Sequence, residues 1–286
     1  MPITNDSLPA PLAREEQGPD QSPGPRRRIG LTRETLVVRG LQVLLGLVLL
    51  GLWQLAADLK WPDPVLAKSP VQSWDYLVSA ARSGELWSNT RATMAAVLIA
   101  WVLAGLAGTV AGLALGLMPR TERVLSPYLD AANAMPRIAL APLLIVALGI
   151  GTSAKVALAS TLVFFIVLSG ARAGIRSADA DWLLLSSVLG ARKHQLFGKV
   201  MLPVATPAIF AALRLGLIYS LLGVVGSELI SARDGLGQLI AYDSSVFQME
   251  GVYGILVLLA VIAVVLNQLM GVAERWLLRW QPPAVR

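Results

Sequence analysis

The sequence contains no cysteine and a single histidine, His194, which excludes several classes of site at once. Disulfide bonds, thiolate nucleophiles and Cys-based metal sites need residues that this chain lacks. HExxH and GxSxG do not occur. Gly198-Lys199 is followed by Val200 rather than by Ser or Thr, so the P-loop pattern for ATP is also missing. We therefore expect a protein without catalytic residues, metal or cofactor.

Charge is scarce as well. Charged residues make up 15% of the chain, against about 25% in an average soluble protein. Hydrophobic residues make up 55%, and the mean hydropathy is +0.64. The net charge of +6 is not gathered on a solvated basic domain with interleaved aromatics, as nucleic-acid binding requires. We expect a protein of the lipid bilayer and no nucleic-acid partner.

Long apolar runs separate the charged residues. Crossing a bilayer as a helix takes roughly 20 apolar residues. Six stretches qualify, the third being broken by prolines: about 36–59, 94–117, 124–150, 156–173, 205–230 and 252–272. They predict an all-α polytopic membrane protein with about six transmembrane helices, forming one transmembrane domain over residues 34–286.

Polar segments surround these runs. Residues 1–33 are rich in Pro, Gly and charge, which predicts a disordered cytoplasmic tail. The first outer connection, residues 60–92, contains a short amphipathic helix near the interface. Residues 118–123 are expected to form a short turn. A long polar connection covers residues 174–204.

The distribution of Lys and Arg predicts the orientation, because cytoplasmic segments carry an excess of both. With the N-terminus inside, 16 of the 24 fall on cytoplasmic segments and six, including Lys155, fall on outer loops. We expect both termini, and the 174–204 connection, in the cytoplasm.

The 174–204 connection has a helix–glycine–helix pattern. Apolar residues recur at helical spacing before Gly190, at Trp182, Leu185, Val188 and Leu189, and a second short amphipathic segment follows. A glycine in this position is typical of a helix C-terminal cap. Such a hairpin can lay its apolar face in a groove of a soluble partner. It can equally lie on lipid headgroups. The residues alone leave both possibilities open.

Gly190, nine residues, Val200, one residue and Leu202-Pro203 resemble the cytoplasmic coupling motif of ABC importer permeases. That motif is written EAA, three residues, G, nine residues, I, one residue, LP. Here the EAA positions hold Leu184, Leu185 and Ser186, so the family Glu is absent. The resemblance implies that this loop docks on a separate ATPase. The residues it assigns to docking are Leu184, Leu185, Ser186, Gly190, Ala191, Val200, Leu202 and Pro203.

The resemblance covers about residues 90–275 and extends to a subgroup. Pro136, then Ala139 to Leu143, then Gly149-Ile150-Gly151 resemble the nitrate/sulfonate/taurine type, as does SELISARDGLGQLI after the fifth run. It implies a type I ABC importer permease fold in a bacterial inner membrane. It also implies two ATP-binding subunits, a second permease copy in a homodimer, a periplasmic or lipid-anchored solute-binding protein, and alternating access of a small solute such as an anion. The alternative is a stand-alone secondary transporter or channel.

Polar residues inside the apolar runs are candidates for the translocation path, because ionisable groups within a bilayer are costly and usually face protein or water. They are Asp130, Asn133, Arg137, Arg214 and Glu228. The alternative for each is structural: pairing within the bundle, or an interfacial position. Asn133, Asn267 and Ser220 are expected to hydrogen-bond between helices, and the glycines of the second run, from Gly105 to Gly116, to allow close packing.

Overall fold

The computed structural model describes residues 33–61 and 63–279. The chain divides into two compact units, residues 1–49 and 50–286, with the boundary inside helix α1 (Arg33–Asp58). Within the first unit itself, the large apolar side chains from Leu36 to Leu49 lie on the surface of the helix. The predicted tail, except for Arg33, lies outside the described residues.

In the described residues of the second unit, every regular element is a helix. The elements after α1 are α2 (Pro70–Arg82), α3 (Glu85–Leu117), α4 (Pro119–Ala134), η1 (Arg137–Leu140), α5 (Ala141–Leu148), α6 (Thr152–Arg176), α7 (Ala180–Val188), α8 (Lys193–Leu196), the π-helical turn η2 (Phe197–Met201), α9 (Leu202–Ile230), α10 (Leu236–Ser245) and α11 (Met249–Leu277). The all-α prediction is confirmed.

Within the described residues, five helical stretches are long and apolar enough to cross a membrane: those of α1, α3, α6, α8 to α9, and α11. A sixth span is possible if α4 and the η1–α5 segment count as one. This pair is bent by 80° at residues 135–136, the break expected from Pro136. The prediction of about six spans, with an interrupted third, agrees with this arrangement.

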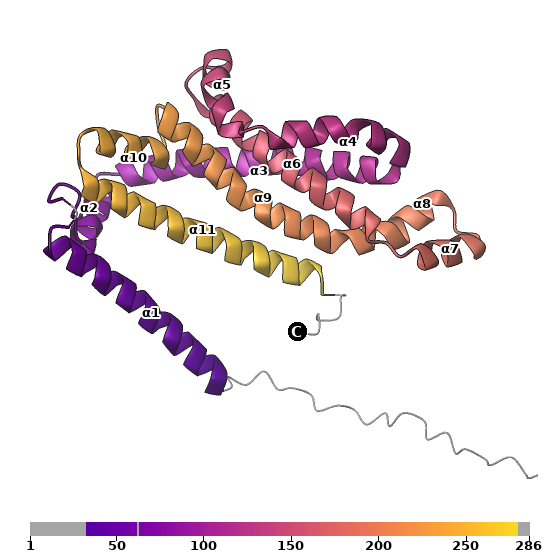
Figure 1. The fold of residues 1–286 in the computed structure, drawn as a ribbon, viewed down its shortest axis with the longest axis horizontal. Coiled ribbons are helices and arrows are strands. Elements are labelled where there is room, and N and C mark those ends of the chain that lie inside the picture. The colour runs from indigo at the N-terminus through magenta and orange to yellow at the C-terminus, as the bar shows by residue number, and fades with distance from the viewer. Residues whose placement is uncertain (1–32, 62, 280–286) are drawn as a thin grey trace, which may run out of the picture. The chain divides into compact units, whose positions relative to one another are not determined.

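The core of the second unit is formed by α3, α6 and α9, which pack side by side (Figure 1). Small residues permit the close approach that membrane helices use in place of a hydrophobic driving force. A Cβ on Gly112 of α3 would lie 2.5 Å from the carbonyl oxygen of Leu168 on α6. A Cβ on Gly223 of α9 would lie 2.9 Å from the Cα of Ala159. The prediction of close packing through glycines of the second run is confirmed.

Two expectations about the connections have opposite outcomes. The amphipathic helix in residues 60–92 is confirmed as α2, which starts with a capping box at Ser69 and has Pro70 in its first turn. The prediction of a turn over residues 118–123 is wrong, because α4 already begins at Pro119. Proline suits the first position of a helix, where its missing N–H has no intrahelical partner.

The two ends of the second unit differ in character. The short helices α7 and α8 lie at one end, and α10 lies at the other, with α9 running between them (Figure 1). The coupling motif and the segment after the fifth run are thus separated by the length of α9.

Candidate functional site

The helix–glycine–helix hairpin is confirmed as α7, Gly190 and α8. Asp179 caps α7 by accepting a hydrogen bond from the backbone N–H of Asp181 at 2.8 Å. Gly190 follows the helix with φ +81°, a left-handed conformation that glycine adopts without a Cβ penalty. The backbone N–H of Ala191 then donates to the carbonyl of Ser186 at 3.0 Å, which closes the turn.

The apolar face of α7 is not covered by the described part of this chain. Trp182, Leu185, Val188 and Leu189 are all exposed, Val188 by 75% and Leu189 by 78%. Leu184, at the position of the family Glu, is exposed as well. The exposed side of α7 is therefore largely apolar.

The second helix of the hairpin continues into a core helix. α8 continues through the π-helical turn into α9, and Lys193–Ile230 forms one helical stretch of 38 residues. Val200 lies in the π-helical turn, and Leu202-Pro203 form the first turn of α9. Because the helix is continuous, a displacement of α8 would be carried directly to α9.

An ion-pair cluster lies where α6 approaches the hairpin. Glu122 of α4 is buried, and its carboxylate meets the guanidinium groups of Arg172, at 3.4 Å, and Arg176, both on α6. In the order of residues, these arginines stand out only as cytoplasmic charge. The buried Glu122 was missed, because nothing in the order of residues shows that α4 folds back beside α6.

The candidate path residues of the broken span fall into two sets of contacts. Asn133 accepts a hydrogen bond from Nη2 of Arg137 at 2.6 Å, across the break between α4 and η1. The guanidinium of Arg137 also lies 4.6 Å from the centre of the Phe165 ring on α6. Asp130 instead accepts a hydrogen bond from Ser126 at 3.2 Å on its own helix. No carboxylate pairs with Arg137 among the residues described.

Arg214 lies in a different place, between α9 and α11. Its Nε donates to the side-chain oxygen of Asn267 at 2.7 Å, and its Nη1 lies 3.5 Å from the carboxylate of Glu274. The interhelical role predicted for Asn267 is confirmed. So is that of Ser220, whose hydroxyl donates to the carbonyl of Val97 at 2.8 Å.

Glu228 is buried near the far end of α9, where α10 lies. Its Oε1 lies 3.0 Å from Nζ of Lys155, and both side chains are at most 1% exposed. The distribution of charge predicted that Lys155 lies in an outer loop, and this prediction is wrong. Lys155 belongs to the first turns of α6 and faces inward. The missed signal was Glu228 itself, because a carboxylate within a span calls for a cation nearby.

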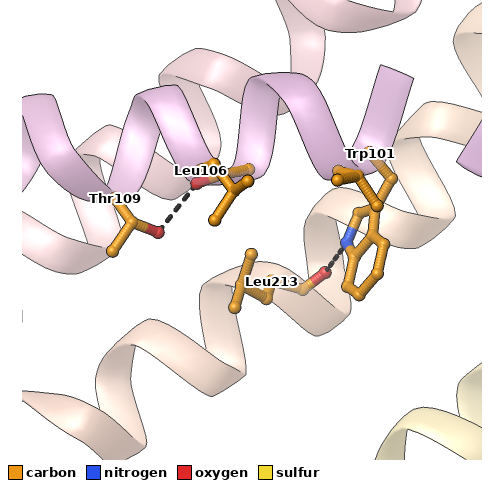
Figure 2. A pocket seen from close by; sticks show the side chains of 6 residues that line it. Trp101, Leu106, Thr109 and Leu213 are labelled. Atoms are coloured by element: carbon orange, nitrogen blue, oxygen red, sulfur yellow. Dashed lines mark hydrogen bonds between the residues drawn. The ribbon is translucent and has the colours of Figure 1, made fainter. Parts of the chain in front are cut away.

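A groove of about 160 Å³ lies between α3 and α9, lined by Trp101, Val102, Gly105, Leu106, Thr109 and Leu213. Figure 2 shows how its polar atoms are used. Trp101 Nε1 donates to the carbonyl of Leu213 at 2.8 Å, and the Thr109 hydroxyl donates to the carbonyl of Gly105 at 2.7 Å. The remaining lining is apolar, so the groove suits an apolar group rather than a charged solute.

A titratable pair lies outside the spans, between α2 and α10. Burial raises the pKa of the Tyr76 phenol, and the neighbouring Asp243 carboxylate raises it further. Burial also raises the pKa of Asp243, and the charges of Glu85 and Glu250 act in the same direction, whereas the Tyr76 phenol beside it lowers this pKa. Gly251 of α11 leaves the space that both side chains occupy.

The helical arrangement described above agrees with the protein family that the sequence matches. Residues 104–280 match the family described as binding-protein-dependent transport system inner membrane component. The chain belongs to this family, and is therefore an integral membrane subunit of an ABC transport system. Such subunits are generally non-catalytic.

Relatives across most of the chain carry different solute names. The riboflavin transport system permease protein RibX of Chloroflexus aurantiacus is 34% identical, over 85% of this chain and 90% of its own length. The taurine transport system permease protein TauC of Escherichia coli is 29% identical, over 82% of this chain and 86% of its own. The putative aliphatic sulfonates permease SsuC of Bacillus subtilis is also 29% identical, over 84% and 87%. The nitrate/sulfonate/taurine-type resemblance is thus supported.

The fold has relatives among solved structures. A chain of the inward-facing MetNI methionine ABC transporter superposes with a TM-score of 0.57 at 20% identity, covering 66% of this chain and 96% of that one. A chain of an amino acid ABC transporter gives a TM-score of 0.54 at 20% identity, covering 70% and 97%. The fold is that of type I ABC importer permeases.

Proposed function

We propose that this chain is the permease subunit of an ATP-driven importer and that α7 is its docking element for a separate ATPase. The observation that carries this proposal is the apolar face of α7, which the described part of the chain leaves uncovered. The family motif that continues from Gly190 to Pro203 supports the same role.

The composition of α7 favours a protein partner over the membrane surface. Helices that lie on lipid headgroups are rich in Lys and Arg on their polar face. The sequence of α7, ADWLLLSSV, contains an acidic residue and no basic one. Its apolar side chains fit the mode in which an amphipathic helix occupies a groove of its partner.

In the proposed assembly, two copies of this chain form a homodimer around the path. Two ATP-binding subunits dock from the cytoplasm, and a periplasmic or lipid-anchored solute-binding protein delivers the solute. Both termini are cytoplasmic, which follows from the distribution of basic residues. Closure of the ATPases moves α7 and α8, the continuous helix from Lys193 carries this movement to α9, and the path alternates between inward and outward access.

For the solute, we propose a small anion such as a sulfonate, taurine or nitrate. Arg137 is the candidate that supports this most. Its described contacts are with Asn133 and Phe165, neither of them charged, so its positive charge is available to an anion. Arg214 already has the carboxylate of Glu274 beside it. Asp130 and Glu228 stay candidates for the path, with Glu228 held in the buried pair with Lys155.

A pull-down of the cognate ATPase by the detergent-purified chain tests the docking surface. Val188→Asp places a charge on the exposed face of α7, whereas Val246→Asp makes the same change at an exposed position beyond α10. We expect Val188→Asp to lose the ATPase and Val246→Asp to retain it. Equal retention by both variants would remove α7 from the docking surface. Failure of the unaltered chain to retain any ATPase would contradict the permease assignment itself.

A further inference from the structure

Four segments of the second unit meet at one buried cluster of charges. Nζ of Lys155 on α6 contacts Oε1 of Glu228 on α9 at 3.0 Å and both the carbonyl and carboxylate oxygens of Asp234 at 2.6 Å. The same Glu228 carboxylate accepts from the Thr93 hydroxyl of α3 at 3.0 Å and from the backbone N–H of Gly237 at 2.9 Å. The loop that leads into α10 is thus tied to three core helices.

Backbone groups of this loop complete the cluster. The N–H of Leu236 donates to the Thr93 hydroxyl at 2.9 Å, and the N–H of Gly235 donates to the Asn89 side chain at 2.7 Å. Gly235 has φ +118°, and a Cβ there would collide with the Glu228 carboxylate. The loop therefore fits around the carboxylate only because this position is glycine.

These contacts hold the first turns of α10, whose apolar side chains are buried. Leu236 is fully buried, and Leu239 and Ile240 of α10 are nearly so. At its other end, α10 leads to Phe247, whose φ of +58° is a strained conformation for a bulky residue, although its ring is exposed. Strained backbone of this kind persists where surrounding structure enforces it, and it is often found at switch regions.

A buried ion pair is a weak device for stability alone, because well-packed apolar residues of similar volume often serve as well. Its best-attested use is to specify one arrangement out of two. Here one of its three side chains, that of Asp234, is half exposed, whereas those of Lys155 and Glu228 are buried. The cluster therefore borders solvent at Asp234, on the loop side.

We propose that Lys155 and Glu228 form an ionic lock that holds the 231–235 loop and α10 over the outer end of the helix bundle, and that the lock opens during the transport cycle. The assignment of this end as the outer one rests on the proposed function, since it lies opposite the α7–α8 hairpin. Both residues are positioning residues: they act through α10 and need not touch the solute.

The absence of cysteine provides a direct test, because a single introduced thiol is the only one in this chain. Leu236→Cys is placed in the full complex with its ATPase and solute-binding protein, in nanodiscs, and treated with a membrane-impermeant maleimide. We expect slow labelling without nucleotide. With ATP and a hydrolysis-deficient ATPase, labelling should be at least about tenfold faster, as the open state becomes populated. Equal, slow labelling in both states would overturn the proposal.

Two further thiols calibrate the measurement. Arg233→Cys, in the exposed part of the loop, should label in both states, and Val163→Cys, buried in the core, in neither. Adding Lys155→Met to Leu236→Cys leaves Glu228 buried without its cation, so labelling should be fast without nucleotide. Labelling as slow as with Lys155 present would also overturn the lock. If Lys155→Met does not assemble, the nucleotide comparison with Lys155 intact still decides.

The two proposals fail in distinguishable ways. ATP-driven uptake with slow Leu236→Cys labelling in every state would remove the lock and leave the permease assignment in place. Absence of ATP-driven uptake by the unaltered complex would contradict the proposed function, whatever the labelling rates.

Discussion

Glu122 on α4 lies buried beside Arg172 on α6, with the guanidinium Nε 3.4 Å from the carboxylate oxygen, and Arg176 approaches the same oxygen. This cluster links the first turn of α4 to the last turns of α6, immediately before α7 begins. It lies at the point from which the α7–α8 hairpin extends.

Replacing Glu122 by Gln should therefore destabilise the protein, because the carboxylate that both arginines face is lost. Since Arg176 is largely exposed, we expect a loss of about 2 kcal/mol, below the range for a fully buried pair. Thermal unfolding in detergent measures this as a lower Tm. Arg123→Gln, at an exposed position on the same helix, is the matched control and should leave the Tm within error. Equal Tm values for both variants would contradict a structural role for Glu122.

Two glycines that receive the same substitution should respond in opposite directions. In Gly112→Ala the new Cβ would meet the Leu168 carbonyl oxygen, which belongs to the backbone and cannot rotate away. We expect a loss of about 1–3 kcal/mol from overpacking between α3 and α6. Gly226 on α9 has no atom within 4 Å of its would-be Cβ. Gly226→Ala should be neutral, or stabilising by up to about 1 kcal/mol through helix propensity. A tolerated Gly112→Ala would show that the helices can separate at this point.

Asp243 predicts a dependence of stability on pH. Its pKa in the folded protein is raised, chiefly by burial, so the folded state binds a proton more tightly than the unfolded chain does. The stabilisation by the protonated form is complete below the ordinary pKa of an aspartate and is lost as pH rises through the folded pKa. Asp243→Asn should raise the Tm towards neutral pH and flatten its pH profile.

Asp75→Asn on α2 is the control for this effect, because Asp75 is exposed. It should leave the pH profile of the Tm unchanged. A profile that stays as steep in Asp243→Asn as in the unaltered protein would assign the pH dependence to another group.

Arg137 should affect transport and leave folding intact. Arg137→Gln removes the positive charge and keeps a hydrogen-bonding group near Asn133. We expect uptake of an anionic solute to fall by at least about tenfold, the equivalent of one charge-assisted hydrogen bond. The Tm of the complex and its retention of the ATPase should be unchanged. Arg137→Lys, which keeps the charge, should retain part of the uptake. Unchanged uptake in Arg137→Gln would remove Arg137 from the path.

Much of the fold could be predicted because it is encoded locally. The lengths of the apolar runs located the long helices, and the spacing around Gly190 located the hairpin. The start of α4 was missed because the sequence from Pro119 to Arg123 is polar, and polarity in a membrane protein also suits a turn. Only the fold shows that Glu122 of this segment is buried against α6.

The candidate site was harder to predict because its contacts are long-range. Lys155 and Glu228 lie 73 residues apart in sequence, and no local pattern around either residue predicts that the two are in contact. A charge count along the chain placed Lys155 in a loop, whereas a buried carboxylate can stabilise its ammonium group inside the bundle. Local patterns found Glu228, Arg214 and Arg137 as candidates. They could not show that Arg214 faces Glu274 whereas Arg137 faces an aromatic ring.

Solute uptake into proteoliposomes, with ATP and the ATPase inside and the solute-binding protein outside, distinguishes an ATP-driven permease from other transporters. We expect uptake that requires ATP, is lost in Val188→Asp and persists in Val246→Asp. Uptake that proceeds without ATP, equally in both variants, would contradict this expectation and favour a stand-alone secondary transporter or channel.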